Sequence, residues 1–126
     1  MAVIAVFNQK GGVGKTTTCL NLTAAFSLAQ RSPIAIDMDP QGHLSLASGL
    51  KHGTSQVKSI VSFFKEHIPL AKLLYETPAG WQLVPSTLEL SKIDALYGSD
   101  PQAAKMLSTG LKEELSLTGA PILIDC

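Results

Sequence analysis

The sequence predicts an α/β fold in which a parallel sheet is flanked by helices. Two short apolar runs, residues 2–7 and 34–36, enclose a long helical pattern over residues 16–30, and this strand–helix–strand order is typical of a right-handed βαβ unit. A third apolar run, residues 121–125, ends in a carboxylate. Because the carboxyl ends of parallel strands meet at one edge of a sheet, we expect a ligand site along that edge.

Composition narrows the class of protein. The chain has 126 residues, of which 45% are hydrophobic and 16% charged, which is typical of a soluble globular domain with a real core. Ten basic and ten acidic side chains cancel, so the net charge points to neither nucleic acid nor an anionic membrane. No apolar run approaches the roughly 18 residues of a membrane span, and no signal peptide is recognisable. We therefore expect a cytoplasmic protein without a transmembrane segment, in which Cys19 and Cys126 are reduced thiols that fill small buried spaces.

The segment KGGVGKTT, residues 10–17, connects the first apolar run to the helical pattern. Its three glycines allow a sharp turn that brings backbone N–H groups against an anion, and the helix that follows adds the favourable end of its dipole. Lys15 can then reach the terminal phosphates of a nucleotide, and the hydroxyl of Thr16 is placed to bind Mg²⁺. The residues expected to contact the nucleotide are Lys10, Gly11, Gly12, Val13, Gly14, Lys15, Thr16 and Thr17.

This loop departs from the common phosphate-binding pattern. A GxxxxGK[ST] motif ending at Thr16 needs glycine at position 9, where the chain has Gln9, and a second lysine, Lys10, stands at the head of the loop. An ordinary glycine-rich turn is the alternative, but strand, loop, GKT and helix occur in the required order. KGGVGKT resembles the deviant P-loop of the ParA/MinD group of ATPases, which includes the partition proteins. The resemblance implies a P-loop NTPase fold of the SIMIBI-like type.

The stretch DMDPQG places two carboxylates, Asp37 and Asp39, after the second strand. Carboxylates at this edge can meet Mg²⁺ or water, although either one could instead cap the helix indicated by residues 43–48. DxDPQG resembles the second motif of the partition ATPases. By that resemblance Asp39 positions the attacking water and Asp37 lies near the metal. His43 stands where the family usually has asparagine or another small polar residue, and we assign it no role.

The segment PILID, residues 121–125, resembles a Walker B element, in which the aspartate holds Mg²⁺ through water. An apolar strand ending in aspartate is a weak signal alone, but it follows the other two motifs at a suitable distance. The family usually continues with Cys or Thr and then two prolines, whereas this sequence ends at Cys126. The expected metal site comprises Thr16, Asp37 and Asp125.

The remaining sequence indicates further helices and one strand. Apolar residues at helical spacing favour core-packing helices rather than a cofactor-binding stripe. Trp81 is expected to pack at the start of a strand rather than to stack on a base. The helical segments predicted are 55–67, 69–75, 87–97 and 101–117, and the strand is 81–85.

The resemblance covers the whole chain but only about the first half of a typical family member. We therefore interpret residues 1–126 as the N-terminal part of a single P-loop ATPase domain, truncated after the Walker B strand. The resemblance implies Mg²⁺-dependent ATP binding and slow hydrolysis, with Lys10, Lys15 and Asp39 as the catalytic set. It also implies an ATP-bound homodimer, in which Lys10 reaches the partner's nucleotide, together with non-specific DNA binding and a centromere-binding partner protein.

Two alternatives remain at this point. A nucleotide-gated ATPase positioned on a membrane, as in the MinD branch, shares the deviant loop, and an inactive truncated fragment would also carry these motifs. The DPQG stretch favours the ParA branch, because the MinD branch usually has other residues after its second aspartate. A solvated surface lysine is the alternative for Lys10.

Overall fold

The computed structural model describes residues 3–6, 13–50, 58–92, 101–115 and 118–126. Within these residues five strands form one sheet in the order β1-β5-β2-β4-β3. The strands are β1 (Val3–Val6), β2 (Ile34–Asp37), β3 (Tyr75–Glu76), β4 (Gln82–Val84) and β5 (Ile122–Asp125). All neighbouring pairs are parallel except β3 with β4. The parallel sheet predicted from the sequence is thus confirmed, with one antiparallel edge.

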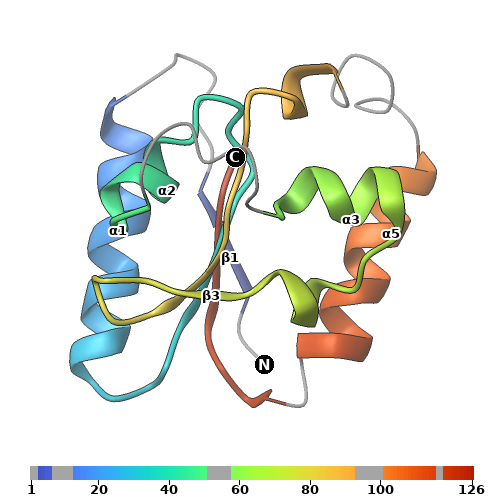
Figure 1. Ribbon diagram of the computed structural model, residues 1–126. Coiled ribbons are helices and arrows are strands. Elements are labelled where there is room, and N and C mark those ends of the chain that lie inside the picture. Colours follow the sequence, from blue (N-terminus) through green and yellow to red (C-terminus); the bar gives the residue numbers. More distant parts are fainter. Residues whose placement is uncertain (1–2, 7–12, 51–57, 93–100, 116–117) are drawn as a thin grey trace.

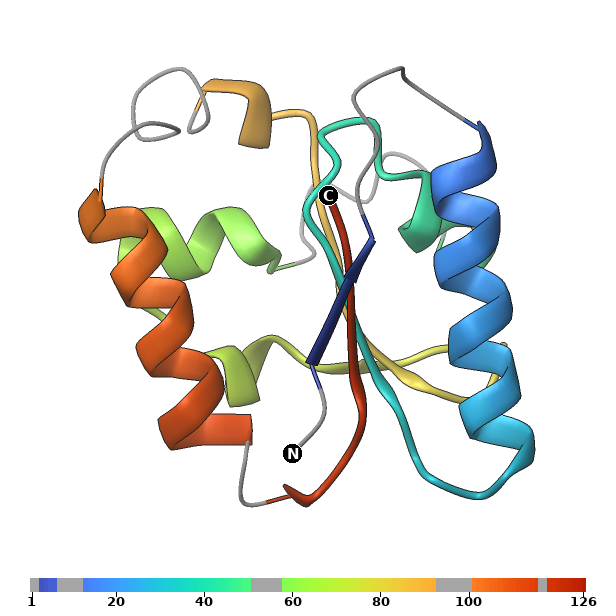
Figure 2. The same ribbon diagram turned by 180° about the vertical axis from the view of Figure 1, so that it is seen from behind.

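Helices cover both faces of the sheet (Figure 1). On one face lie α1 (Val13–Leu28) and α2 (His43–Ala47), and on the other lie α3 (Ile60–Glu66) and α5 (Pro101–Gly110). The second view shows the same three layers from behind (Figure 2). Two further helical turns are the 3₁₀ turn η1 (Leu70–Leu73) and the π-helical turn η2 (Leu111–Leu115).

The two hydrophobic cores follow the period-2 alternation of the central strands. In β5, Ile122 and Ile124 pack into the core under α3 and α5, whereas Leu123 packs into the core under α1 and α2. In β2, Ile34 and Ile36 likewise face the first core and Ala35 the second. All residues of both strands are buried, as expected for parallel strands covered on both faces.

The first strand differs from the sequence expectation. The continuous apolar run over residues 2–7 is typical of a strand buried on both faces, but β1 alternates between exposed and partly buried residues, and Val3 is 40% exposed. The reason is its position, because β1 lies at the edge of the sheet and pairs only with β5 among the described strands.

The first helix runs from Val13 to Leu28, whereas the helical pattern of the sequence covers residues 16–30. Gln30 has a φ of 60°, and Arg31 N–H donates to the Phe26 carbonyl oxygen at 3.0 Å while Gln30 N–H donates to that of Ser27. These two bonds satisfy the last carbonyls of the helix in a Schellman motif. Pro33 then opens the extended segment that leads into β2.

Two other boundaries were predicted wrongly. Of the helix expected over residues 55–67, residues 55–57 lie outside the described residues, and α3 begins at Ile60 because Ser59 is extended and its hydroxyl accepts the N–H of Val61 as an N-cap. The helical turn expected to reach Tyr75 ends at Leu73, and Tyr75 pairs with Leu83. A hairpin turn over residues 77–80 makes this pair antiparallel, with Gly80 N–H donating to the Thr77 carbonyl oxygen.

The remaining predictions concern single residues and partly described segments. Trp81 is 7% exposed, and its Nε1–H donates to Ser48 Oγ at 3.1 Å, so packing is confirmed. Cys19 is buried as expected, but Cys126 is exposed. Of the helix predicted over residues 87–97, residues 90–92 are helical and residues 93–97 lie outside the described residues, as does the end of the helix predicted over 101–117. Among the helices that are described, none combines the length and the apolar character needed to cross a membrane.

Candidate nucleotide-binding site

The N-terminus of α1 follows the glycine-rich segment directly. Lys10, Gly11 and Gly12 lie outside the described residues, whereas the backbone of residues 13–17 forms the first turn of the helix. Backbone N–H groups in a first helical turn have no partner within the helix and are oriented to bind an anion. Gly14 is exposed, and a Cβ built on it would meet no atom within 4 Å. A ligand can therefore approach the backbone closely at this point.

Thr16 and Asp125 join the first and third sequence motifs. The Thr16 hydroxyl donates to Asp125 Oδ2 at 3.0 Å, although 109 residues separate them. Both residues are buried, with exposed fractions of 9% and 0%. The contact forms because α1 begins, and β5 ends, at the same edge of the sheet. A hydroxyl and one or two carboxylates are the oxygen ligands that Mg²⁺ uses beside substrate phosphates, so these residues fit the predicted metal.

Asp37 lies beside Asp125 at the same edge. The two residues are register partners on the adjacent parallel strands β2 and β5, and both are fully buried. Burial raises the pKa of the Asp37 carboxyl to about 6, hydrogen bonds from Ser45 and from the Asp39 backbone act against that rise, and the nearby Asp125 carboxylate adds to it. The structure therefore brings together all three residues of the predicted metal site.

The hydrogen bonds of Asp37 bear on its alternative role as a helix cap. Its Oδ1 accepts the backbone N–H of Asp39 at 3.0 Å, and its Oδ2 accepts both the backbone N–H and the hydroxyl of Ser45 at 2.9 and 2.6 Å. The N-cap position of α2 is Gly42, which has no side chain to accept these groups. Asp37 supplies the missing acceptor from the end of β2, so its carboxylate does cap α2.

Asp39 lies in the connection between β2 and α2 and not in a helix. Its Oδ1 accepts the Gln41 backbone N–H at 3.0 Å, and its Oδ2 lies 3.5 Å from Nδ1 of His43. The His43 side chain is largely exposed, whereas that of Asp39 is mostly buried. The histidine that was given no role therefore contacts the carboxylate that was predicted to position water.

Ser45 was missed by the sequence reasoning. Its hydroxyl both donates to Asp37 and accepts the backbone N–H of Ser86 at 3.2 Å. The available signal was a hydroxyl residue in the first turn of a short helix that starts after a glycine. Such a helix needs an acceptor from elsewhere, and the nearest carboxylates in the sequence are Asp37 and Asp39.

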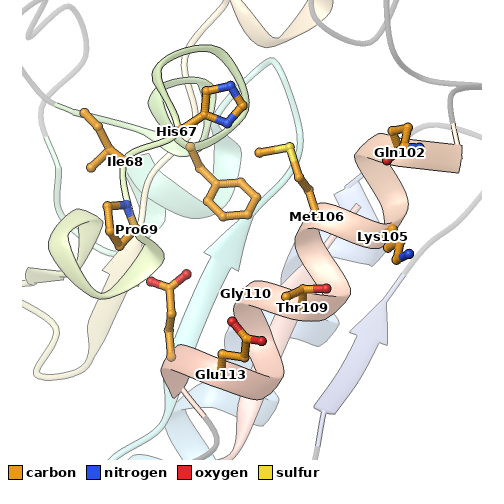
Figure 3. A pocket seen from close by; sticks show the side chains of 11 residues that line it. His67, Ile68, Pro69, Gln102, Lys105, Met106, Thr109, Gly110 and Glu113 are labelled. Carbon is orange, nitrogen blue, oxygen red and sulfur yellow. The ribbon is translucent and has the colours of Figure 1, made fainter.

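A separate pocket of about 360 Å³ lies on the opposite helical layer (Figure 3). His67 and Pro69 line one side, and Met106, Thr109 and Glu113 line the other. Gly110 also lines this pocket, and the absence of a side chain lets Phe63 and Leu70 pack close to it, since a Cβ there would come within 3.1 Å of both. No residue predicted to act on the nucleotide lines this pocket.

Two features define the P-loop class of nucleotide-binding proteins. The first is a parallel sheet whose first strand is followed by a helix that opens with GKT, and the second is a carboxylate at the end of another strand that accepts a hydrogen bond from that threonine. Comparison with known proteins places the chain more closely, because the family described as AAA domain matches residues 1–126. A chromosome partitioning protein ParA from Myxococcus xanthus is 34% identical over 125 residues, 98% of this chain and 44% of that protein. The chromosome-partitioning ATPase Soj from Treponema pallidum is 35% identical over 126 residues, 94% of this chain and 46% of that protein.

A solved structure shares the same fold. The cobyrinic acid a,c-diamide synthase from Mycobacterium smegmatis, with bound ADP and magnesium, matches with a TM-score of 0.85 and 30% identity, covering 100% of this chain and 51% of that one. The chain belongs to the AAA domain family and is of the ParA/Soj type, with a deviant Walker A loop. It spans less than half the length of these two partitioning relatives.

The raised pKa of Asp37 predicts a pH dependence of folding stability. The folded state holds this proton more tightly than the unfolded state, whose carboxyl has a pKa of 3.8. The resulting stabilisation is complete below pH 4 and is lost as the pH rises through about 6. A shift of this size corresponds to something on the order of 3 kcal/mol.

We expect Asp37→Asn to flatten the change in unfolding free energy between pH 4 and pH 7 relative to the parent protein, as measured by urea denaturation at a series of pH values. The exposed Glu89→Gln serves as the control and should leave the profile unchanged. Identical slopes for Asp37→Asn and the parent would contradict the assignment of the raised pKa to Asp37.

Proposed function

We propose that this chain is the nucleotide-binding part of a ParA-like partition ATPase, which binds ATP with Mg²⁺ and hydrolyses it slowly. The observation that carries the proposal is the buried hydrogen bond between the Thr16 hydroxyl and the Asp125 carboxylate. It brings the end of the P-loop to the end of the Walker B strand, as the binding of a metal–nucleotide complex requires. The ADP and magnesium of the M. smegmatis synthase support the same choice of cofactors.

Each residue of the site has a proposed role. The backbone of residues 11–17 and the Lys15 ammonium bind the phosphates, and Thr16 and Asp125 hold Mg²⁺, with Asp37 beside them. When bound, Mg²⁺ neutralises charge on the phosphate oxygens. Asp39 orients the attacking water through its carboxylate.

Lys10 is proposed to act across a dimer interface. A lysine at the head of the loop that reaches the partner's nucleotide would stabilise charge developing during phosphoryl transfer, as an arginine finger does in trans. This role comes from the family resemblance, since residues 7–12 lie outside the described part of the chain.

The wider proposal concerns domain organisation and partners. We take residues 1–126 as the N-terminal part of a single P-loop ATPase domain in a cytoplasmic protein that forms an ATP-dependent homodimer. The dimer binds DNA non-specifically and works with a centromere-binding protein. The descriptions of the relatives as ParA and Soj support partition over the membrane-positioning alternative.

Lys15→Ala tests the nucleotide site. Losing the principal side-chain cation should weaken ATP binding by the full-length protein at least about 100-fold, as measured by titration calorimetry with Mg²⁺ present. Lys72→Ala, which removes an exposed lysine from η1, is the matched control and should bind ATP normally. Unchanged affinity in the Lys15 variant would remove the P-loop assignment.

Asp39→Asn tests the water-positioning role. Asparagine keeps an oxygen that can accept the Gln41 N–H but lacks the negative charge, so the loop should persist while kcat falls about 100-fold or more. ATP affinity should stay within about threefold, and the ATP-bound dimer should accumulate. Steady-state phosphate release at the parental rate would show that Asp39 has no role in turnover.

Lys10→Ala tests the trans role. We expect the full-length variant to bind ATP as a monomer but to lose both dimerisation and turnover, the latter by about 100-fold or more. Light scattering with ATP present, run beside a turnover assay, measures both effects. A normal dimer with normal turnover would make Lys10 a solvated surface lysine.

A further inference from the structure

The connection from β2 to α2, which carries Asp39, is held by one carboxylate. Asp37 Oδ1 accepts the Asp39 backbone N–H, and Asp37 Oδ2 accepts two groups of Ser45. Asp37 thus joins the backbone at Asp39 to the first turn of α2. Because Asp37 is 0% exposed, water cannot easily replace a lost hydrogen bond, and the orientation of its carboxylate depends on these donors.

Ser45 extends this connection to a second strand. Its buried hydroxyl accepts the backbone N–H of Ser86 while it donates to Asp37. Ser86 follows β4 after Pro85, and the Pro85 carbonyl oxygen accepts the N–H of Ile60 at the start of α3. The Ser45 hydroxyl is therefore the point at which the loop after β2 is tied to the loop after β4.

We propose that Ser45 is a positioning residue, which holds Asp37 in the orientation that fixes the backbone of Asp39. The inference rests on the proposed function, in which the Asp39 carboxylate orients the attacking water. Without the hydroxyl, Asp37 Oδ2 keeps only the Ser45 backbone N–H, and Ser86 N–H loses a buried acceptor. The carboxylate can then turn, and Asp39 loses the acceptor for its N–H. A misplacement of about 1 Å in such a group can reduce turnover by about 100-fold.

Ser48 provides a matched control on the same short segment. It is also fully buried, and its hydroxyl accepts the Trp81 Nε1–H at 3.1 Å, whereas the groups that donate to the Asp37 carboxylate within the described part of the chain belong to Asp39 and Ser45. Ser48→Ala therefore removes a buried hydroxyl and leaves a buried donor without its acceptor, as Ser45→Ala does. A role in folding alone would give the two variants the same behaviour.

The first readout uses the nucleotide-free, full-length protein. Amide hydrogen exchange over residues 37–45 should be at least about tenfold faster in Ser45→Ala than in the parent, because the Asp39 and Ser45 amides lose a fixed acceptor. Ser48→Ala should leave exchange over residues 37–45 within about twofold of the parent. Equal exchange in the Ser45 variant and the parent would overturn the inference.

The second readout is ATP turnover. Ser45→Ala should lower kcat by about 10-fold to 100-fold with KM for ATP within about threefold, whereas Ser45→Thr, which retains a hydroxyl, should recover most of kcat. Ser48→Ala should keep parental kcat. If Ser45→Ala does not fold, Ser45→Cys, which keeps the volume but donates only weakly, takes its place with the same expected results.

The outcomes separate the two proposals. A parent protein with no ATP turnover would contradict the proposed function, and the exchange measurement would still test whether Ser45 holds the loop. A parent protein that turns ATP over, with Ser45→Ala and Ser48→Ala indistinguishable in both readouts, would overturn the positioning role and leave the proposed function standing.

Discussion

The insertion of β5 between β1 and β2 is the constraint on which the rest of the structure depends. β5 pairs in parallel with both β1 and β2, and its side chains contribute to both hydrophobic cores. Its register also sets the site, since it puts Asp125 opposite Asp37 and within hydrogen-bond distance of Thr16. A one-residue slip in the register of β5 would turn Asp125 to the other face of the sheet and would move Leu123 into the core under α3 and α5.

The same register places two fully buried carboxylates side by side, which is unfavourable in the absence of a compensating charge. Hydrogen bonds from Asp39 and Ser45 to the Asp37 carboxylate offset part of this unfavourable free energy. A divalent cation at this edge would offset the remaining repulsion, which supports Mg²⁺ as the proposed cofactor. Groups with perturbed pKa values in such a position are typical of functional sites.

Much of the fold could be predicted because its signals are local. Continuous apolar runs predicted β2 and β5, and the helical pattern over residues 16–30 predicted most of α1. The failures came where neighbours in space decide the outcome. The apolar run of β1 cannot reveal that β1 lies at the sheet edge, and the helical spacing near Tyr75 does not show that a hairpin turn will pair this residue with Leu83.

For the site, the sequence by itself determined the chemical groups and the edge of the sheet where they gather. The spacing of the motifs, and the order in which strands and helices follow one another along the chain, are properties of the sequence. Only the tertiary structure decided which groups touch. In the tertiary structure Asp37 caps α2, His43 lies near Asp39, and Ser45 links the loop after β2 to the loop after β4. These contacts depend on side-chain directions and on the spacing of packed strands and helices, which follow from burying both faces of the sheet at once.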